Sequence, residues 1–400
     1  MQALQHGFCQ MSNKKTIAYL VLNNLGGITN LIQNLILYKN ENSLPDELYL
    51  LDVEGNINAP ASPILDTEIG YKKVYFNPKS NWYHSFHRIS KELSKNTGVL
   101  ISNDQYDLIM LQAFNIPRKV IQLVHDSYNL QLSIKYHEMI DGFIAHNRDI
   151  FDQLQKQLPE RKIDIWFQTY GIPIDTNLIY DKKINESLRL IYIGRHDINK
   201  GIHDLYPIHL KLKEKQIGVQ WIILGEGPET KRLKEQWQFE ENVQFHLAIN
   251  AQHVLEFAYS SDILVFPTKF EGSPLAVLEA MSVGCVPVVT DLPGGISETI
   301  SDGQNGIKCQ LNQLDEFVIA IEHLHNDRNR LKLMQENCRE TIKNSFNVYK
   351  KTEGYLNIFD SYINLNTKPR HHHVNKKIGS RFDHQFIPDV VTKFIRSIKL

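Results

Sequence analysis

The 400-residue chain lacks several features that would assign it to a common class of protein. It contains only four cysteines, widely spaced and without the close pairs of a metal site, and its formal net charge is -1. A disulfide scaffold and a general attraction to nucleic acid are therefore not expected. No apolar run approaches the length needed to span a bilayer, and the first residues lack the apolar core of a signal peptide. We expect a cytoplasmic protein without a nucleic-acid partner.

Alternating strand-like and helix-like segments dominate what is present. Short apolar runs rich in Val, Ile and Tyr alternate with segments of helical period up to about residue 310, and a polar stretch interrupts this alternation once. Strands that are apolar on both faces are typical of a parallel sheet covered by helices, so we predict two doubly wound α/β domains in tandem. The predicted division is a leader at 1–13, a first domain at 14–175, a linker at 176–187, a second domain at 188–366 and a basic amphipathic tail at 367–400.

The stretch EGSPLAVLEAMSVGCVPV, Glu271–Val288, predicts a short helix with well-defined ends. Ser273 is a suitable N-cap, Pro274 fits the first helical position, and Gly284 suits the C-terminal stop. The helix follows an apolar strand, so it begins at the edge of the sheet where doubly wound domains bind ligands. Its first amides would point at an anion such as a phosphate. These amides belong to Leu275, Ala276 and Val277.

Two carboxylates accompany this helix although apolar packing requires neither. Glu279 lies one turn in, on an otherwise apolar stripe, where it can accept hydrogen bonds from two vicinal hydroxyls such as those of a ribose. Glu271 precedes the helix and would lie beside whatever group is attached beyond the phosphates. The same pattern also fits a capped helix with one solvated glutamate, so spacing alone leaves both interpretations open.

A second loop, GRHDINKG at Gly194–Gly201, directly follows a predicted strand. Arg195 and Lys200 place two cations where one loop can bracket a diphosphate. Such charges are often merely solvated, but both loops leave the carboxyl ends of strands in one domain, so they can converge. No two aspartates stand in an Asp-x-Asp arrangement anywhere in the chain. We therefore expect no metal site, with the two cations in its place.

A third loop, NNLGGITN, lies between the first strand and its helix. Gly26 and Gly27 allow a ligand to approach the backbone closely, and the helix dipole favours an anion there. The loop is not the dinucleotide fingerprint, which has three spaced glycines. It adds an anion-binding edge to the first domain, so we expect the ligand to lie in a cleft between the two domains.

These segments resemble the retaining glycosyltransferases of family 4, which have the GT-B fold of two Rossmann-like domains facing a cleft. The matching segments span about Leu188 to Lys308 in the family's order: IYIGRHDINKG, WIILGEGPE, NVQF, FEGSPLAVLEAMSVGCVPV and GGISETISDGQNG. The first domain matches more loosely, through GGITN, LVHD and YGIPID. The resemblance implies an α/β protein of GT-B fold with a helical C-terminal extension.

The resemblance also implies a role for each marked residue. Arg195 and Lys200 would hold the diphosphate of a nucleotide sugar, and Glu279 would hold its ribose. Glu271 and the backbone after it would hold the sugar, with His125 in the cleft nearby, although a lone histidine at a strand end is more often structural. The implied donor-binding set is Gly26, Gly27, Arg195, Lys200, Gly272, Ser273, Pro274, Leu275, Ala276 and Glu279, and the implied catalytic set is His125, Arg195, Lys200 and Glu271.

Two departures from the family's pattern bear on the identity of the donor. Gly272-Ser273-Pro274 stands where the family often has Gly-Phe-Gly, and HLA follows NVQF in place of Leu-Gly. The implied reaction is metal-independent transfer of a hexose-type sugar, with retention, from a nucleoside diphosphate sugar to a carbohydrate or lipid-linked saccharide. It would serve bacterial surface polysaccharide or lipopolysaccharide synthesis and need no cofactor beyond the donor. A nucleotide-sugar epimerase and a non-catalytic GT-B binding module remain alternatives.

The tail, Thr367–Leu400, differs from the rest of the chain in charge. It has eight Lys or Arg residues against two Asp residues, a net of +6. Pro388 would open a helix with apolar residues on one face and basic residues off it, which is typical of an anchor on an anionic membrane surface. The apolar residues are Val390, Val391, Phe394, Ile395 and Ile398, and the basic ones are Lys393, Arg396 and Lys399. The alternative is a terminal helix docked on the first domain, with His371–His373 as a linker.

Overall fold

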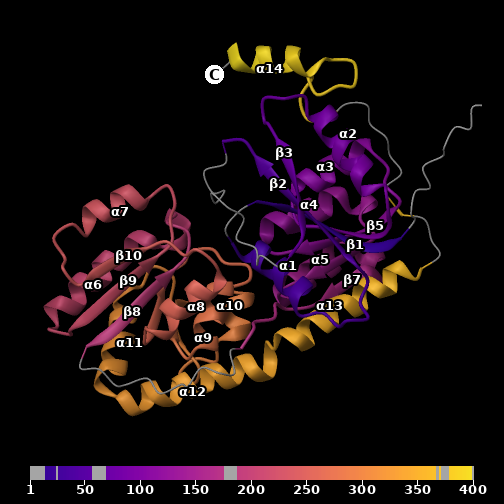
Figure 1. Ribbon diagram of the computed structural model, residues 1–400. Coiled ribbons are helices and arrows are strands. Elements are labelled where there is room, and N and C mark those ends of the chain that lie inside the picture. Colours follow the sequence, from indigo (N-terminus) through magenta and orange to yellow (C-terminus); the bar gives the residue numbers. More distant parts are fainter. Residues whose placement is uncertain are drawn as a thin grey trace, which may run out of the picture.

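The chain forms two α/β domains that lie side by side, with a long helical segment running along both (Figure 1). A computed structural model describes residues 14–23, 26–55, 69–174, 187–365, 369–370 and 378–398. The expected leader at 1–13, and the expected linker except Ser187, lie outside the described residues.

Each domain is built on one parallel sheet. The first sheet has the strand order β3-β2-β1-β4-β5-β6-β7, and the second has the order β10-β9-β8-β11-β12-β13. All neighbouring strands pair in parallel. The strands are β1 Lys15–Leu22, β2 Asp46–Val53, β3 Tyr71–Phe76, β4 Thr97–Ser102, β5 Arg118–Val124, β6 Gly142–Ala145, β7 Ile165–Phe167, β8 Leu188–Ile193, β9 Val219–Leu224, β10 Val243–His246, β11 Ile263–Phe266, β12 Val286–Thr290 and β13 Ile307–Cys309. The prediction of two doubly wound domains is confirmed.

The helices cover both faces of each sheet. In both domains the strand order runs outward in two directions, from β1 and β4 and from β8 and β11. Because parallel crossovers are right-handed, the two directions place their helices on opposite faces and leave a crevice at the switch point. The α-helices are α1 Gly27–Leu37, α2 Trp82–Leu93, α3 Gln105–Ala113, α4 Ser127–Tyr136, α5 Arg148–Gln157, α6 Leu205–Glu214, α7 Thr230–Gln236, α8 Ala251–Tyr259, α9 Leu275–Ser282, α10 Gly295–Thr299, α11 Leu314–Asn326, α12 Arg328–Ser345, α13 Val348–Ile363 and α14 Asp389–Ile398.

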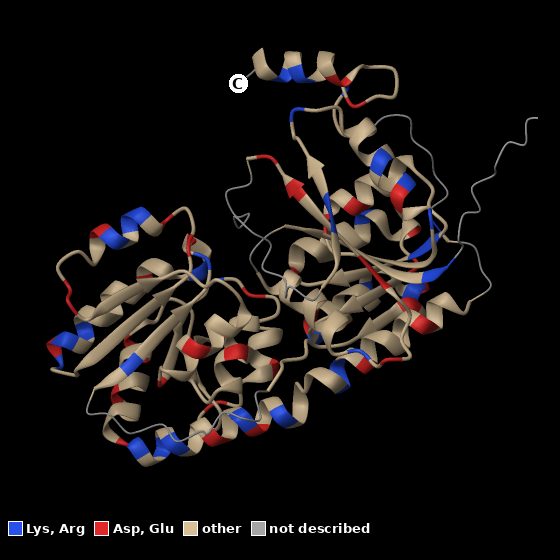
Figure 2. Ribbon diagram, in the orientation of Figure 1, with Lys and Arg blue, Asp and Glu red and all other residues tan. Residues whose placement is uncertain are grey.

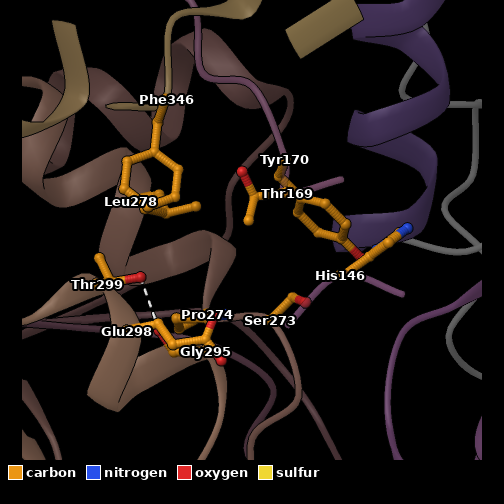
Figure 3. A pocket seen from close by; sticks show the side chains of 10 residues that line it. All are labelled: His146, Thr169, Tyr170, Ser273, Pro274, Leu278, Gly295, Glu298, Thr299 and Phe346. Carbon is orange, nitrogen blue, oxygen red and sulfur yellow. Dashed lines mark hydrogen bonds between the residues drawn. The ribbon is translucent and has the colours of Figure 1, made fainter. Parts of the chain in front are cut away.

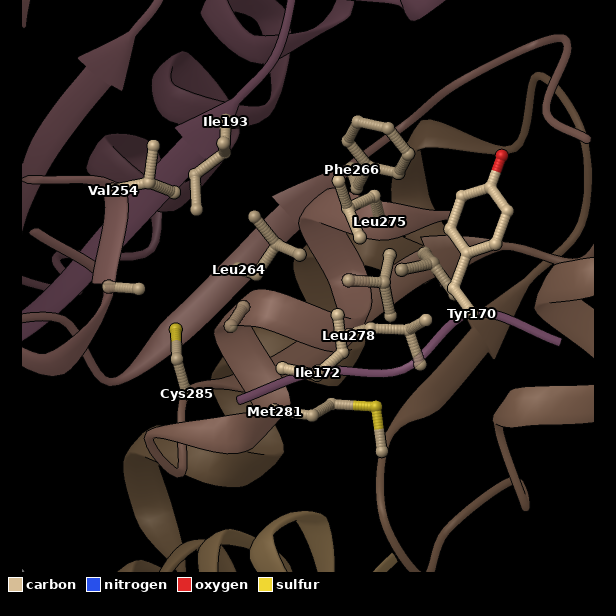
Figure 4. Packing of buried hydrophobic residues seen from close by; sticks show 14 of the residues in the cluster. Tyr170, Ile172, Ile193, Val254, Leu264, Phe266, Leu275, Leu278, Met281 and Cys285 are labelled. Atoms are coloured by element: carbon tan, nitrogen blue, oxygen red, sulfur yellow. The ribbon is translucent and has the colours of Figure 1, made fainter. Parts of the chain in front are cut away.

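Helix α9 lies at the centre of the second domain. It packs against α8, α12 and β12, and seven of its eight residues are buried. Leu275, Leu278 and Met281 lie in the same apolar cluster as Leu264 and Phe266 of β11 (Figure 4). A helix surrounded in this way is apolar on every side, which makes the carboxylate that it carries at Glu279 conspicuous.

Helix α13 joins the two domains. It belongs to the expected second domain at 188–366, yet it packs against α1, β4 and β5 of the first domain. A Cβ added at Gly142 would lie 2.5 Å from the Tyr362 ring, and one at Gly171 would lie 2.7 Å from Val348 Cα. These close approaches show that α13 is seated on the first sheet. The chain therefore returns to the first domain after completing the second.

The tail segment 378–398 lies against the start of α2. Asn81 Nδ2 donates to the carbonyls of His384 and Ile387, at 2.9 and 2.6 Å, and Ile378 is buried. The expected helix after Pro388 is present as α14. Among the helices of the described residues, none is both long and apolar enough to cross a membrane.

Candidate active site

The loop after β8 is pressed against the end of β11. Gly201 has a φ of 68°, and a Cβ there would lie 1.9 Å from the Pro267 carbonyl oxygen, so glycine alone fits. The adjacent Lys200 ammonium donates to Glu271 Oε2 at 2.9 Å and to the Phe270 carbonyl at 3.1 Å. The structure therefore brings Lys200 and Glu271 together, as expected from two loops at the carboxyl edge of one sheet.

Arg195 lies in the same loop and is half exposed. Its Nη2 atom is 3.0 Å from Asp197 Oδ2, while Asp197 Oδ1 accepts the Asn199 amide and begins a short 3₁₀ turn at Ile198–Lys200. That backbone hydrogen bond and the ion pair with Arg195 lower the pKa of the Asp197 carboxyl. Both cations of the loop are thus paired with carboxylates, Arg195 with Asp197 and Lys200 with Glu271.

The segment Phe270–Gly272 touches the first domain. A Cβ added at Gly272 would lie 2.2 Å from the His125 carbonyl oxygen, and the Gly272 carbonyl accepts the Asn147 side-chain amide at 2.8 Å. Burial raises the pKa of the Glu271 carboxyl, and the ion pair with Lys200 opposes that rise. Only glycine at position 272 allows the two domains to approach this closely beside Glu271.

The start of α9 differs from the sequence expectation. Pro274, with φ -80° and ψ 71°, is the N-cap, whereas Ser273 was expected to cap and Pro274 to be helical. The Leu275 amide donates to the Ser273 carbonyl and the Val277 amide to the Pro274 carbonyl, at 2.9 and 3.0 Å. Two of the three amides expected to face an anion therefore already have backbone partners. The expected end of the helix is confirmed, since Gly284 has a φ of 72°.

Glu279 links α9 to the first domain. Asn30 Nδ2 of α1 donates to Glu279 Oε1 at 3.1 Å, and burial raises the pKa of this carboxyl to about 7. A Cβ at Gly27 would meet Leu275 at 3.5 Å, whereas one at Gly26 would meet no atom within 4 Å. The glycine loop of the first domain thus faces the helix that carries Glu279, with open space at Gly26.

His125 lies at the carboxyl end of β5 and is almost fully buried. Its Nδ1 atom is 2.6 Å from the Tyr170 hydroxyl and its Nε2 atom is 3.2 Å from Asn103 Oδ1. Because Oδ1 only accepts, Nε2 carries the proton and Nδ1 accepts from Tyr170. Burial lowers the pKa of His125 to about 3, so the ring is neutral. Both ring nitrogens are occupied in this conformation, which the sequence did not indicate.

Tyr170 and His146 are site residues that the sequence analysis did not single out. The rings of His125 and His146 meet edge to face with centroids 4.6 Å apart, and His146 Nε2 is 3.3 Å from the hydroxyl of Tyr355 on α13. A small cavity adjoins this group (Figure 3). Tyr170, His146 and Ser273 lie together at one end of the cavity, and Leu278 and Phe346 lie at the other. The only sequence signal that could have identified Tyr170 as a site residue was its place in the segment YGIPID.

A larger pocket, partly open to solvent, lies between the domains and is lined by Glu271. Its first-domain wall comes from the starts of α4 and α5, where Asp126 and Asn147 are the N-caps. Its second-domain wall comes from residues 269–272 and 292–293. The polar side chains that line it are Asp126, Ser127, Asn147, Asp149, Gln153, Lys269 and Glu271. Such a lining suits a ligand rich in hydroxyl groups.

Comparison with known proteins finds a family match that falls largely in the second domain. Residues 178–342 match the family model of glycosyl transferases group 1. The UDP-Gal:alpha-D-GlcNAc-diphosphoundecaprenol alpha-1,3-galactosyltransferase of Escherichia coli is 31% identical over 147 residues, 36% of this chain and 37% of that protein. The capsular polysaccharide biosynthesis glycosyltransferase CapM of Staphylococcus aureus is 26% identical over 186 residues, 45% of this chain and 48% of its own length. The chain thus matches less than half the length of either relative.

A solved structure has the same two-domain fold. HepE of Anabaena, in its complex with UDP-glucose, superposes with a TM-score of 0.70 at 15% sequence identity, over 86% of this chain and 99% of that one. An identity this low bears on the fold alone. The predicted GT-B fold, two parallel-sheet domains facing each other, is confirmed.

Proposed function

We propose that this protein is a glycosyltransferase that moves a sugar from a nucleoside diphosphate sugar to a hydroxyl group of a saccharide acceptor. The observation that carries the proposal is the meeting of Lys200 with Glu271 beside Arg195 and the start of α9, at the carboxyl edge of the second sheet. This edge lies within the residues that match glycosyl transferases group 1. HepE, which shares the fold, is in complex with UDP-glucose.

The loop after β8 would act on the leaving group. Breaking the bond between sugar and diphosphate develops negative charge on the diphosphate, which Arg195 and Lys200 would stabilise more in the transition state than in the ground state. Their present partners, Asp197 and Glu271, already hold the two cations in place. Released from Lys200, Glu271 can accept hydrogen bonds from sugar hydroxyls. Retention of configuration and membership of family 4 are part of the proposal, supported by the spacing of Glu271 and Glu279.

The larger pocket beside Glu271 is the proposed acceptor site. Asp126, Asp149 and Gln153 offer oxygen atoms and an amide to saccharide hydroxyls, next to Glu271. A lipid-linked saccharide is the proposed acceptor, because the E. coli relative is named for a diphosphoundecaprenol substrate and the S. aureus relative for capsular polysaccharide biosynthesis. The proposed place of action is the cytoplasmic face of the cell membrane, in bacterial surface polysaccharide synthesis.

The test is a donor screen on the full chain. Purified protein is incubated with UDP-, GDP- and ADP-sugars, with and without a lipid-linked saccharide, and both nucleotide release and the sugar product are followed. Nucleotide release that depends on the acceptor, with a new glycosidic bond, is the expected result. Conversion of the sugar without transfer would instead identify an epimerase, and binding of the nucleotide sugar without turnover would identify a binding module.

Turnover is expected to persist in EDTA. Arg195 and Lys200 supply the positive charge at the diphosphate that a divalent cation supplies in other enzymes, so chelation leaves that charge in place. The measurement is the rate of nucleotide release before and after dialysis against EDTA. Loss of activity that Mg²⁺ or Mn²⁺ restores would contradict the metal-independent mechanism.

Glu279→Gln is expected to weaken donor binding about tenfold, since a carboxylate accepts hydrogen bonds from hydroxyls more strongly than an amide does. Folding should not suffer. Burial raises the pKa of Glu279 from 4.5 to about 7, so the charged carboxylate destabilises the folded state increasingly as pH rises from 4.5 to 7. Glutamine removes this penalty, and the free energy of unfolding at pH 8 should be equal or higher.

Calorimetric titration with the donor and denaturant unfolding at pH 8 measure the two effects of Glu279→Gln separately. Glu336→Gln, on the exposed side of α12, is the matched control and should change neither quantity. A Glu279→Gln protein that is less stable but binds the donor normally would show that Glu279 serves only to hold Asn30 across the interface.

A further inference from the structure

The outer face of α14, together with the turn before it, is an exposed apolar surface on the first domain. It consists of Phe386, Val390, Val391, Phe394 and Ile398, with exposed fractions of 77%, 77%, 44%, 67% and 68%. Helix α14 lies at the outer end of that domain, beyond α2 and β3 (Figure 1). Of the five apolar residues expected on one side of this helix, Val390, Val391, Phe394 and Ile398 are exposed and face away from the protein, whereas Ile395 is partly buried.

The opposite, polar face holds α14 in place. Asp383 Oδ1 accepts the Trp82 amide at 2.8 Å and Asp389 Oδ1 accepts the Asn81 amide at 2.7 Å, so the two carboxylates cap the start of α2. Thr392, which belongs to α14, is fully buried.

Arg396 completes this attachment. Its guanidinium donates to Asp383 Oδ2 at 2.7 Å and to the Pro78 carbonyl at 3.1 Å, and the Asp383 side chain is only 1% exposed. A helix that docks on its own domain normally buries its apolar side. Helix α14 is attached by its polar side, which leaves the apolar side unpartnered and fixed in direction.

The surroundings of the outer face favour an anionic partner. Lys79 and Arg381 are exposed on the segments that adjoin α14. Basic residues and acidic residues are both present on α14 and the turn before it (Figure 2). The two acids of the segment are already engaged, Asp383 with Arg396 and Asp389 with Lys393. Apolar side chains flanked by the exposed Lys79 and Arg381 match the boundary between acyl chains and anionic headgroups.

A second copy of the chain is the less suitable occupant. A stable protein interface draws about 800 Å² from each partner. Five side chains, four on α14 and one on the turn before it, offer less than that, and symmetric pairing would bring basic residues of two copies together. We propose that the outer face of α14 binds the surface of an anionic lipid bilayer, as a rigid platform on the first domain rather than as a flexible tether.

The position of α14 determines how binding to a bilayer would orient the protein. The helix is attached to residues 78–82, directly after the carboxyl end of β3, and parallel strands bring all their carboxyl ends to one edge. His125 and the glycine loop lie at that same edge. Docking α14 on a bilayer would therefore turn this rim of the cleft toward the lipid surface. This last step rests on the proposed transfer to a lipid-linked saccharide, whereas the binding itself does not.

The structure revises one element of the sequence expectation. Arg396 was expected to face anionic lipid, yet it is committed to Asp383 and to backbone carbonyls of the first domain. Its role is to orient the helix.

The test is co-sedimentation of the full chain with vesicles of phosphatidylcholine and phosphatidylglycerol, compared with phosphatidylcholine alone. The double substitution Phe394→Ser and Ile398→Ser should lower binding to the mixed vesicles at least about tenfold. Both side chains are exposed, so the fold should be unaffected. The matched control is Phe239→Ser, which removes a phenylalanine that is 84% exposed, more than Phe394, from the second domain and should bind as the unchanged protein does.

Each outcome decides the proposal. Unchanged vesicle binding by the double variant, or failure of the unchanged protein to bind mixed vesicles, would overturn it. So would sedimentation equilibrium showing a dimer that the double variant lacks, because the face would then join two copies. Vesicle binding without turnover of any nucleotide sugar would uphold the membrane surface while removing the proposed reaction. Turnover of a soluble acceptor without vesicle binding would uphold the proposed reaction and overturn the membrane surface.

Discussion

Replacing Lys200 with alanine is expected to lower the rate of sugar transfer at least about tenfold, because charge-assisted contacts to a diphosphate contribute roughly 1.5–3 kcal/mol and 1.4 kcal/mol is a factor of ten. The proposed contact strengthens as the leaving group gains charge, so the loss should appear in kcat as well as in kcat/KM. The cation of Lys200 lies 2.9 Å from Glu271 Oε2. The substitution therefore also leaves a buried carboxylate without its partner.

A lower stability of the Lys200→Ala protein must be separated from its loss of activity. The double variant Lys200→Ala, Glu271→Gln removes the unpaired charge and should regain thermal stability without regaining activity. Lys211→Ala is the control for losing a lysine, since its pair with Asp315 lies at an exposed surface, and it should change neither quantity. A stable Lys200→Ala protein with normal kinetics would refute the assignment of this lysine to the diphosphate.

Arg118→Met is expected to cost the first domain about 3–5 kcal/mol of its free energy of unfolding, the usual result of breaking a buried ion pair. The Arg118 side chain is fully buried, with Nη2 2.8 Å from Glu47 Oε1 and Nε 2.7 Å from the Leu93 carbonyl. Its Nη1 atom donates to the carbonyls of Thr16, Thr97 and Val99. Methionine fills part of the space but donates no hydrogen bond to these acceptors.

The same ion pair predicts how the stability responds to acid. Burial alone would raise the pKa of Glu47, but hydrogen bonds from Thr16 and Tyr49 and the charge of Arg118 outweigh it and lower that pKa from 4.5 to about 2. A lowered carboxyl pKa stabilises the fold above pH 4.5, and this contribution is lost as pH falls toward 2. The Arg118→Met protein should show a flatter decline over that range.

Urea unfolding of the first domain at several pH values measures both effects of Arg118→Met. Arg232→Met is the matched control, because Arg232 is exposed and its distance to Glu229 is 3.9 Å, and it should shift stability by no more than about 0.5 kcal/mol. An Arg118→Met protein as stable as the control would show that water satisfies the exposed acceptors.

Local patterns determined much of the architecture. The apolar runs that became β1 and β8, the glycine that ends α9 and the helix after Pro388 all depend on neighbours a few residues away. The convergence of Lys200 and Glu271 also followed from sequence, because loops after adjacent parallel strands, β8 and β11, must share an edge. The start of α9 did not follow, since the turn at Pro274 is held by its packing against Gly295.

The remaining features depended on contacts between residues far apart in the chain. Asn30 meets Glu279 across 249 positions, and Tyr170 meets His125 across 45. Helical period indicated that the last helix has an apolar side. The ion pair between Arg396 and Asp383, which also accepts the Trp82 amide at the start of α2, decided that this side faces outward. By itself the sequence determined which segments are strands and helices and which loops carry charge, because periodicity and capping are local. The tertiary structure decided which buried polar groups are partners, because a hydrogen bond is set by the meeting of two surfaces that no short stretch of sequence contains.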